Sequence, residues 1–292
     1  MLRGLLLSST LLIACGYTLP LSATRPAASL AGISLARVRD GESIDVGAAL
    51  AASQGKTLLV LATHAADFNS VEYAQKLRAF LPQLREKGVT RFLMVVNGDE
   101  TQCSKLADLV GLPEAVEVLA DPAGEAGRAY GVSRGPFADD ANLSPFAKLF
   151  VMGVVGGPGA WSTLPAVLVG YFGSPKGCRQ WIDSALMQGQ QAGRWPAVLE
   201  LAADETILSN KFDDTPLLAG WNVRPFELAT LRLQNLIGVQ LEHWNALKPA
   251  DDRCLTQLGG CTVVGSGGEA LYSWVDNGLC DVPDMNDLID VL

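Results

Sequence analysis

The sequence predicts an α/β fold, in which a central sheet is flanked by helices and a helical insertion precedes a C-terminal hairpin. Three observations lead to this prediction. Apolar runs of strand length alternate with helical segments between residues 57 and 120, a Gly- and Pro-rich stretch then breaks the pattern, and two strand-like runs joined by glycines follow near the C-terminus. Alternating strands and helices are typical of a parallel sheet with right-handed crossovers.

The first half of the pattern is regular. Residues 57–63 predict a buried strand, and Ser70–Lys87 predicts the helix that follows, with apolar side chains on one face and Gly88 as its stop. A second strand at 92–96, a helix at Glu100–Val110 and a short strand at Val116–Ala120 continue the alternation. Together these segments predict a parallel sheet core.

The second half contains the insertion and the closing elements. We expect helices, and no core strands, at about 133–222, and then one long helix at Arg224–Leu247 with Pro225 in its first turn. Cys261–Val264 and Ala270–Val275 predict a hairpin, and a last helix is expected at Asp284–Leu292. This order is the thioredoxin topology, so one thioredoxin-like domain is expected over residues 45–292.

The composition is that of a globular protein with an acidic surface. Of the 292 residues, 49% are hydrophobic and 18% are charged, and the net charge is -9. No Lys/Arg cluster occurs, so we expect neither nucleic acid nor an anionic membrane surface as a partner. The six cysteines form no CxxC pair and only two histidines are present. The sequence therefore predicts no metal site and no cofactor.

Residues 1–23 have the pattern of a signal or targeting segment. A positive start is followed by apolar Leu5–Ile13 and by Leu21-Ser22-Ala23, a typical cleavage signal. Residues 24–44 are expected to be a transit-like or linker segment, because Ala23–Ala36 is rich in Ala and Ser and contains no acid. These features favour import into a plastid (chloroplast).

A bacterial origin is the alternative for the same leader. Leu12-Ile13-Ala14-Cys15 fits a lipoprotein signal, in which Cys15 becomes the lipidated N-terminus. No later apolar run is long enough to cross a bilayer without a Gly or Pro interruption, so no transmembrane span is predicted in the mature chain.

Polar residues, and no thiol, occupy the junction between the first strand and the first helix. Asp67, Asn69, Ser70 and Glu72 are candidates for a binding pocket at the edge of the sheet where α/β folds bind ligands. The alternative is simple helix capping, because Asn69 and Glu72 have the spacing of a capping box.

No catalytic residue is established by the sequence, and three are low-ranking candidates. His64 lies just past the first strand, where it could act as a general base beside Asp67. Cys103 lies in the first turn of a predicted helix, a position that can activate a thiol. Asp99 and Glu100 precede it, however, and negative charge disfavours a thiolate.

The insertion contains two apolar pieces, Leu149–Val155 and Ala160–Phe172, separated by a Gly-rich turn. Two interpretations remain open. The pieces form a hairpin that docks on a membrane surface or a hydrophobic partner, or they cover the sheet as ordinary core helices.

Several segments resemble peroxiredoxin-like proteins of the AhpC/TSA group found in cyanobacteria and plastids, across most of residues 45–290. They are the junction from Asp67 to Ala74, Leu119-Ala120-Asp121-Pro122, Tyr130-Gly131-Val132, Val154–Leu168 with Gly170-Tyr171, and Arg224–Asn235. The resemblance implies a thioredoxin-like fold. Peroxiredoxins place a peroxidatic cysteine, with a Thr two residues before it, near the start of the first helix, and this chain has neither there.

We therefore expect a peroxiredoxin-like protein without classical thiol peroxidase activity, acting as a binding or assembly component in a plastid or thylakoid setting. The expected partner is a thylakoid or photosynthetic protein complex, contacted through the apolar insertion. The alternative is a thiol-dependent antioxidant oxidoreductase that reduces peroxides or disulfides with a relocated cysteine such as Cys103.

Overall fold

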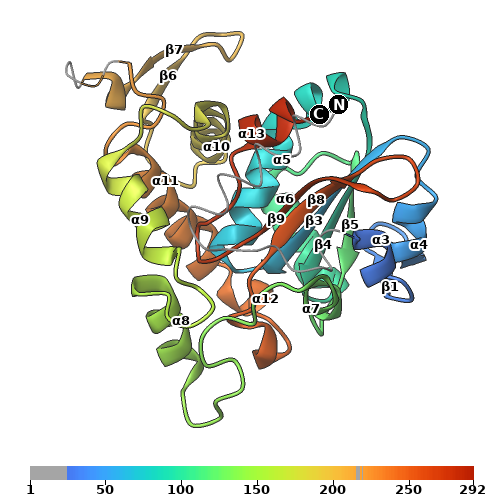
Figure 1. The fold of residues 1–292 in the computed structure, drawn as a ribbon. Helices are drawn as coiled ribbons and strands as arrows, with labels where there is room; N and C mark the ends of the chain where they lie inside the picture. Colours follow the sequence, from blue (N-terminus) through green and yellow to red (C-terminus); the bar gives the residue numbers. More distant parts are fainter. Residues whose placement is uncertain (1–24, 215–217, 219) are drawn as a thin grey trace.

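The computed structural model describes residues 25–214, 218 and 220–292 (Figure 1). The predictions of a targeting segment at 1–23 and of lipidation at Cys15 lie outside the described residues. Within the described part of the chain, no helix combines the length and the apolar character that crossing a bilayer requires.

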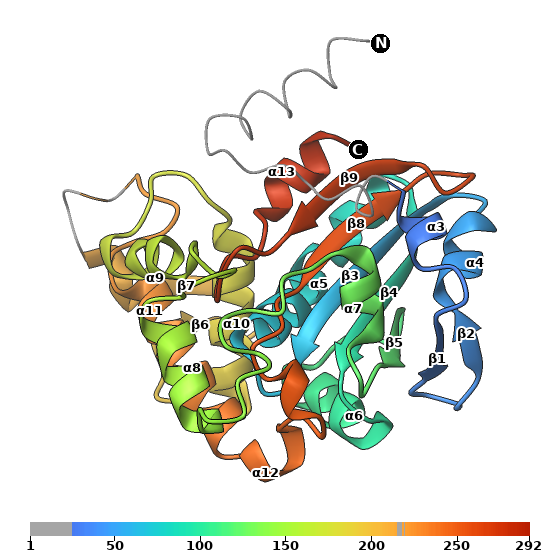
Figure 2. The same ribbon diagram turned by 60° about the horizontal axis from the view of Figure 1, so that its bottom comes forward.

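A seven-stranded mixed sheet forms the centre of the molecule, which confirms the predicted α/β class with a thioredoxin-like sheet flanked by helices. The strand order is β2-β1-β5-β4-β3-β8-β9, with β3, β4 and β5 parallel and the other neighbours antiparallel (Figure 2). The strands are β1 (Ser34–Arg37), β2 (Ser43–Asp45), β3 (Lys56–His64), β4 (Val89–Asn97), β5 (Val116–Ala120), β8 (Gly260–Val264) and β9 (Ala270–Val275).

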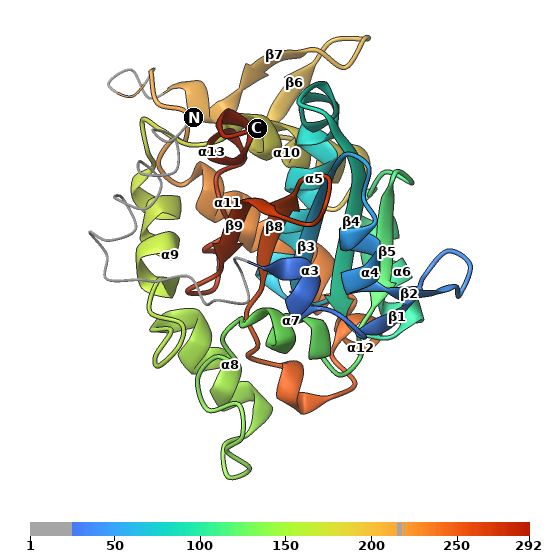
Figure 3. The same cartoon turned by 45° about the vertical axis from the view of Figure 1, so that its right-hand side comes forward.

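Helices cover both faces of the sheet, and each face has its own apolar core. One core joins Leu58, Val60 and Met94 to α5 (Phe68–Glu86) and α6 (Glu100–Val110), and it extends to α13 (Met285–Asp290). The other joins Leu59, Leu61 and Leu93 to three short helices. These are α3 (Pro26–Ser29), α4 (Val46–Ala51) and α7 (Glu125–Tyr130), which lie together on one side of the sheet in Figure 3.

The segment expected to be a transit-like or linker region belongs to the sheet instead. β1 pairs with β5 through Ala36 and Ala120, and β2 pairs with β1 through Ile44 and Leu35. Leu35 is buried against the second core. The linker prediction is therefore wrong where residues 24–44 supply β1 and the start of β2. The two strands are only four and three residues long, too short for a periodic pattern to reveal.

The stretch at 133–222 lies mostly beyond α5, on the left in Figure 1. It contains the helices α8 (Pro145–Val154), α9 (Thr163–Phe172) and α10 (Arg179–Gln191), with α10 packed on α5. It also contains a small hairpin of β6 (Leu199–Leu201) and β7 (Ile207–Asn210), followed by the short helix η1 (Lys211–Asp214). The hairpin was not expected from the sequence.

The predicted long helix at Arg224–Leu247 is divided into three parts. They are α11 (Glu227–Asn235), the π-helical turn η3 (Leu236–Leu241) and α12 (Trp244–Leu247); a short helix η4 (Asp252–Cys254) follows. Phe226, with a left-handed φ of 63°, is the residue just before α11, so Pro225 lies outside the helix. The prediction of one continuous helix was wrong because the apolar pattern continues through the π-helical turn, which simple periodicity does not distinguish.

Candidate functional site

The junction between β3 and α5 is built around the carboxyl group of Asp67. This residue caps the helix, and its Oδ1 accepts hydrogen bonds from the Asn69 N–H at 2.8 Å and from the Thr63 hydroxyl at 2.8 Å. The Thr63 and Ser70 hydroxyls lie 2.9 Å apart. Burial raises the pKa of Asp67 to about 6. The helix N-terminus that would stabilise a thiolate is thus occupied by a carboxyl group.

Asn69 connects this junction to the loop after β9. Its side-chain amide donates to Asp276 Oδ2 at 2.8 Å and to the Gly278 carbonyl at 3.1 Å, and its oxygen accepts from the Cys280 N–H at 2.6 Å. Asp276 also accepts from the Tyr73 hydroxyl at 2.7 Å. Burial raises the pKa of Asp276 well above its ordinary value. The capping-box interpretation of Asn69 and Glu72 is therefore wrong, because the Asn69 side chain binds this loop and Asp67 is the cap.

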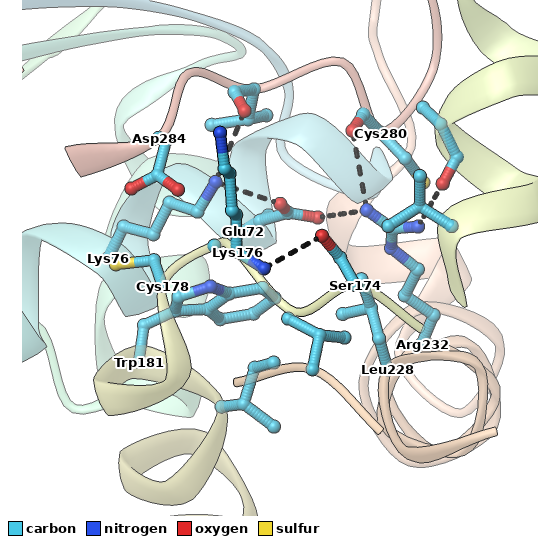
Figure 4. Close-up of a pocket in the computed structure, with 16 residues that line it drawn as sticks. Glu72, Lys76, Ser174, Lys176, Cys178, Trp181, Leu228, Arg232, Cys280 and Asp284 are labelled. Atoms are coloured by element: carbon cyan, nitrogen blue, oxygen red, sulfur yellow. Dashed lines mark hydrogen bonds and ion pairs between the residues drawn. The ribbon is translucent and has the colours of Figure 1, made fainter. Parts of the chain in front are cut away.

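Glu72 points to a different part of the molecule and lies between two cations. Its carboxylate lies 3.0 Å from Lys76 Nζ and 3.2 Å from Arg232 Nη2 (Figure 4). Burial alone would raise the pKa of Glu72, but Arg232 and Lys76 outweigh it, so the pKa is lowered. The carboxylate is therefore ionised, and the three charges form a buried network between α5 and α11.

The two cations of this network have further partners. Lys76 donates to the carbonyls of Val282 and Pro283 and lies 5.2 Å from the centre of the Trp181 ring. Arg232 donates to the carbonyls of Ala166 and Cys280. The network therefore ties α5, α9, α10 and α11 to the loop after β9.

A cavity of about 310 Å³ lies beside this network (Figure 4). The charged triad lines it together with Trp181 and two thiols, those of Cys178 and Cys280. Asp67, Asn69 and Ser70 are not among its lining residues. The four candidate binding residues are therefore divided: three belong to the buried junction, and Glu72 alone faces the cavity.

His64 is buried next to the junction, and neither ring nitrogen makes a well-formed hydrogen bond. Its Nε2 lies 3.9 Å from Asp67 Oδ2, and its ring meets that of Trp244 edge-on at 6.3 Å. Burial lowers the pKa of His64 to about 4, although the backbone of Leu255 partly opposes this. The imidazole is therefore neutral at physiological pH. It contacts the other catalytic candidate, Asp67, without facing the cavity.

The five cysteines in the described part of the chain are all free and buried. Cys103 is 1% exposed, and burial together with Asp99 and Asp121 raises the pKa of its thiol. Burial raises the pKa of Cys178 and of Cys280 to about 12, and that of Cys254 to about 11. Burial likewise raises the pKa of Cys261. None of these thiols has the lowered pKa of a reactive cysteine.

Several residues of the site were not singled out as functional from the sequence. Tyr73 meets Asp276, and Cys280 meets Asn69, through hydrogen bonds that span about two hundred positions, so no local pattern brings them together. Arg232 could have been noticed in the sequence, because it is a charged residue among leucines in a predicted apolar helix. Among the described residues, no group of three or more His, Cys, Asp or Glu side chains is arranged to hold a metal ion.

The chain matches one family model, that of the AhpC/TSA antioxidant enzymes, over residues 76–278. The match covers more than half of the chain and begins inside α5, after the junction with Asp67 and Asn69. No curated protein and no solved structure matches the chain.

Proposed function

Because the chain belongs to the AhpC/TSA antioxidant enzyme family, we propose that it is a peroxiredoxin-like protein without classical thiol peroxidase activity. It acts instead as a binding or assembly component. The observation that carries this proposal is the first turn of α5. There the carboxyl group of Asp67 caps the helix and the β9 loop holds the Asn69 side chain, so the first turn of α5 presents no thiol of its own.

The remaining thiols support the same proposal. Even the thiol of Cys254, whose pKa is raised to about 11, is almost entirely protonated at pH 7. Because the thiolate is the nucleophile that attacks peroxide, such a thiol reacts slowly.

The plastid or thylakoid setting is also part of the proposal, and it rests on the leader composition and on the resemblance to cyanobacterial and plastid proteins. The fold limits where processing can occur. Residues 34–45 supply two strands of the central sheet, so a cleavage that removed residues 24–44 would remove β1 and most of β2. We propose that processing ends before Pro26, at the Leu21-Ser22-Ala23 signal.

A second candidate function is thiol-dependent reduction of peroxides or disulfides, and one observation favours Cys280 over Cys103 for it. Cys280 lines the cavity beside the Glu72 network and has a left-handed backbone with a φ of 64°. Such strain in a non-glycine residue is concentrated at functional sites. Arg232 also favours the thiolate of Cys280, whereas Cys103 has only acidic neighbours.

The test adds stoichiometric hydrogen peroxide to the reduced protein and maps cysteine oxidation over time by mass spectrometry. We expect slow oxidation spread over the buried thiols. The matched variants Cys280→Ser and Cys103→Ser should oxidise at the remaining thiols as slowly as the parent. Rapid oxidation of a single thiol, lost in the corresponding Ser variant, would instead establish the second function and identify its cysteine.

A further inference from the structure

The cavity beside the Glu72 network reaches the surface of the molecule. Its wall is supplied by α5, α9, α10, α11, the loop that joins α9 to α10 and the loop after β9. Two of its lining residues, Val169 of α9 and Lys176 of the first loop, are exposed, so a small molecule can enter from solvent. The volume of about 310 Å³ falls at the lower end of the range for small-molecule sites, about 300–1,000 Å³.

Apolar side chains make up most of the wall, as is typical of ligand sites. They include Trp181 and Ile182 of α10 and Leu228 of α11. The thiols of Cys178 and Cys280 also line the cavity, and both are neutral because burial raises their pKa to about 12. A ligand with an apolar body would therefore be removed from water against these side chains.

The charged groups in the wall carry an excess of positive charge. The cations are Lys76, Lys176 and Arg232, and the carboxylates are those of Glu72 and Asp284. The lining therefore has one positive charge more than it has negative charges, although the chain as a whole has a net charge of -9. Such a wall favours a ligand with a single negative charge.

Two of the three cations have a donor without a partner. Arg232 uses its two Nη atoms on Glu72 and on two carbonyls, but its buried Nε makes no hydrogen bond. Lys176 donates its backbone N–H to the Ser174 hydroxyl at 3.2 Å, whereas its ammonium group pairs with no carboxylate in the described part of the chain (Figure 4). A buried N–H without an acceptor is unfavourable, so an anionic oxygen beside Arg232 would be stabilised.

We propose that this cavity binds a small organic carboxylate with an apolar body. The carboxylate lies between Arg232 Nε and the Lys176 ammonium group, and the apolar body packs against Trp181 and Ile182. A carboxylate carries the single charge that the wall favours, whereas a phosphate is doubly charged. The site goes beyond the proposed function, because binding at it needs neither a reactive thiol nor a protein partner.

The test is isothermal titration calorimetry of the reduced full chain at low ionic strength. The probe is 3-phenylpropionate, which combines a carboxylate with a compact apolar body. Its neutral counterpart 3-phenylpropanamide has nearly the same shape without the charge, and inorganic phosphate has charge without the apolar body. These two compounds separate recognition of the charge from recognition of the apolar part.

Two variants alter the entrance of the cavity, where the side chains are exposed and the fold does not depend on them. Lys176→Gln removes the ammonium group, and Val169→Glu adds a negative charge. The matched controls are Lys248→Gln and Val154→Glu, which make the same changes at exposed residues outside the cavity wall. Circular dichroism should show unchanged folding in all four.

We expect saturable binding of 3-phenylpropionate and binding of the amide and of phosphate that is weaker by roughly tenfold or more. Lys176→Gln should weaken binding of the carboxylate by roughly two- to fivefold, as expected for loss of an exposed charge. Val169→Glu should weaken it at least as much, because the new carboxylate repels the ligand. Both controls should bind as the parent does.

Three results would overturn the proposal. The first is that 3-phenylpropionate does not bind at millimolar concentrations. The second is that the amide or phosphate binds as tightly, which would mean that the charge or the apolar body is not recognised. The third is that the two entrance variants bind as their controls do, which would place the ligand elsewhere. The peroxide test is made without the carboxylate, so a failure of the proposed function would be seen separately.

Discussion

Asp67 and His64 lie close together where β3 ends. Burial favours the protonated form of Asp67 and the deprotonated form of His64. Burial raises the pKa of Asp67 to about 6 and lowers the pKa of His64 to about 4, so burial disfavours the charged form of each. His64 Nε2 lies 3.9 Å from Asp67 Oδ2. Both groups therefore contribute to the pH dependence of folding, with opposite sign.

The two contributions can be separated by substitution. The folded pKa of Asp67 lies above its ordinary 3.8, so its stabilising contribution is full below pH 3.8 and is lost as the pH rises through about 6. The folded pKa of His64 lies below its ordinary 6.5, so its contribution is full above pH 6.5 and is lost as the pH falls through about 4. Each shift corresponds to about 3 kcal/mol.

We therefore expect Asp67→Asn to make the free energy of unfolding increase with pH between 4 and 6.5, relative to the parent. His64→Leu should make it decrease with pH over the same interval. Urea denaturation at several pH values measures both effects. Parallel curves for the parent and the two variants would show that neither group titrates in this range.

At the scale of elements, helices and strands with a regular apolar pattern could be predicted from the sequence, whereas short or irregular elements could not. Glu100–Val110 and Val116–Ala120 have the bounds that the sequence predicts, because their ends are marked by Asp99, Gly111 and Asp121. β1 and β2 were missed because their pairing partners are needed to identify such short strands. At the candidate site, the sequence pointed to Asp67 and Glu72 but did not show that they belong to different parts of the molecule. The direction of each side chain depends on contacts with α11 and the β9 loop, which are distant in the sequence.

The contact between α5 and α11 depends strongly on Arg232. Arg232→Met would leave Glu72 with Lys76 alone and would remove the donor to the Ala166 and Cys280 carbonyls. Loss of one partner of a buried ion pair costs about 3–5 kcal/mol. The control Arg253→Met removes the exposed pair with Asp251 and should cost much less, because solvent screens that pair. Chemical denaturation compares the two variants, and equal losses would mean that Arg232 contributes no more stability than the exposed Arg253.

At the scale of the whole molecule, the central sheet depends on residues near the N-terminus as well as on the thioredoxin-like core. Leu30 and Leu35 are buried in the second core, and Arg37 joins β1 to Glu117 of β5 at 3.0 Å. The central sheet therefore continues past β5 to β1 and β2, which form its outer edge. A mature chain must retain these strands to keep β5 paired on both sides.

A truncated chain that starts at Asp45 tests this dependence against one that starts at Thr24. The shorter chain loses the burial of Leu30 and Leu35, each worth about 1.5–3 kcal/mol, and leaves β5 as an unpaired edge that favours aggregation. We expect it to unfold at a clearly lower temperature and to elute as aggregates in size-exclusion chromatography, whereas the Thr24 form behaves as the full chain. If both forms unfold at the same temperature, β1 and β2 are dispensable. The proposed limit on processing before Pro26 would then have no structural basis.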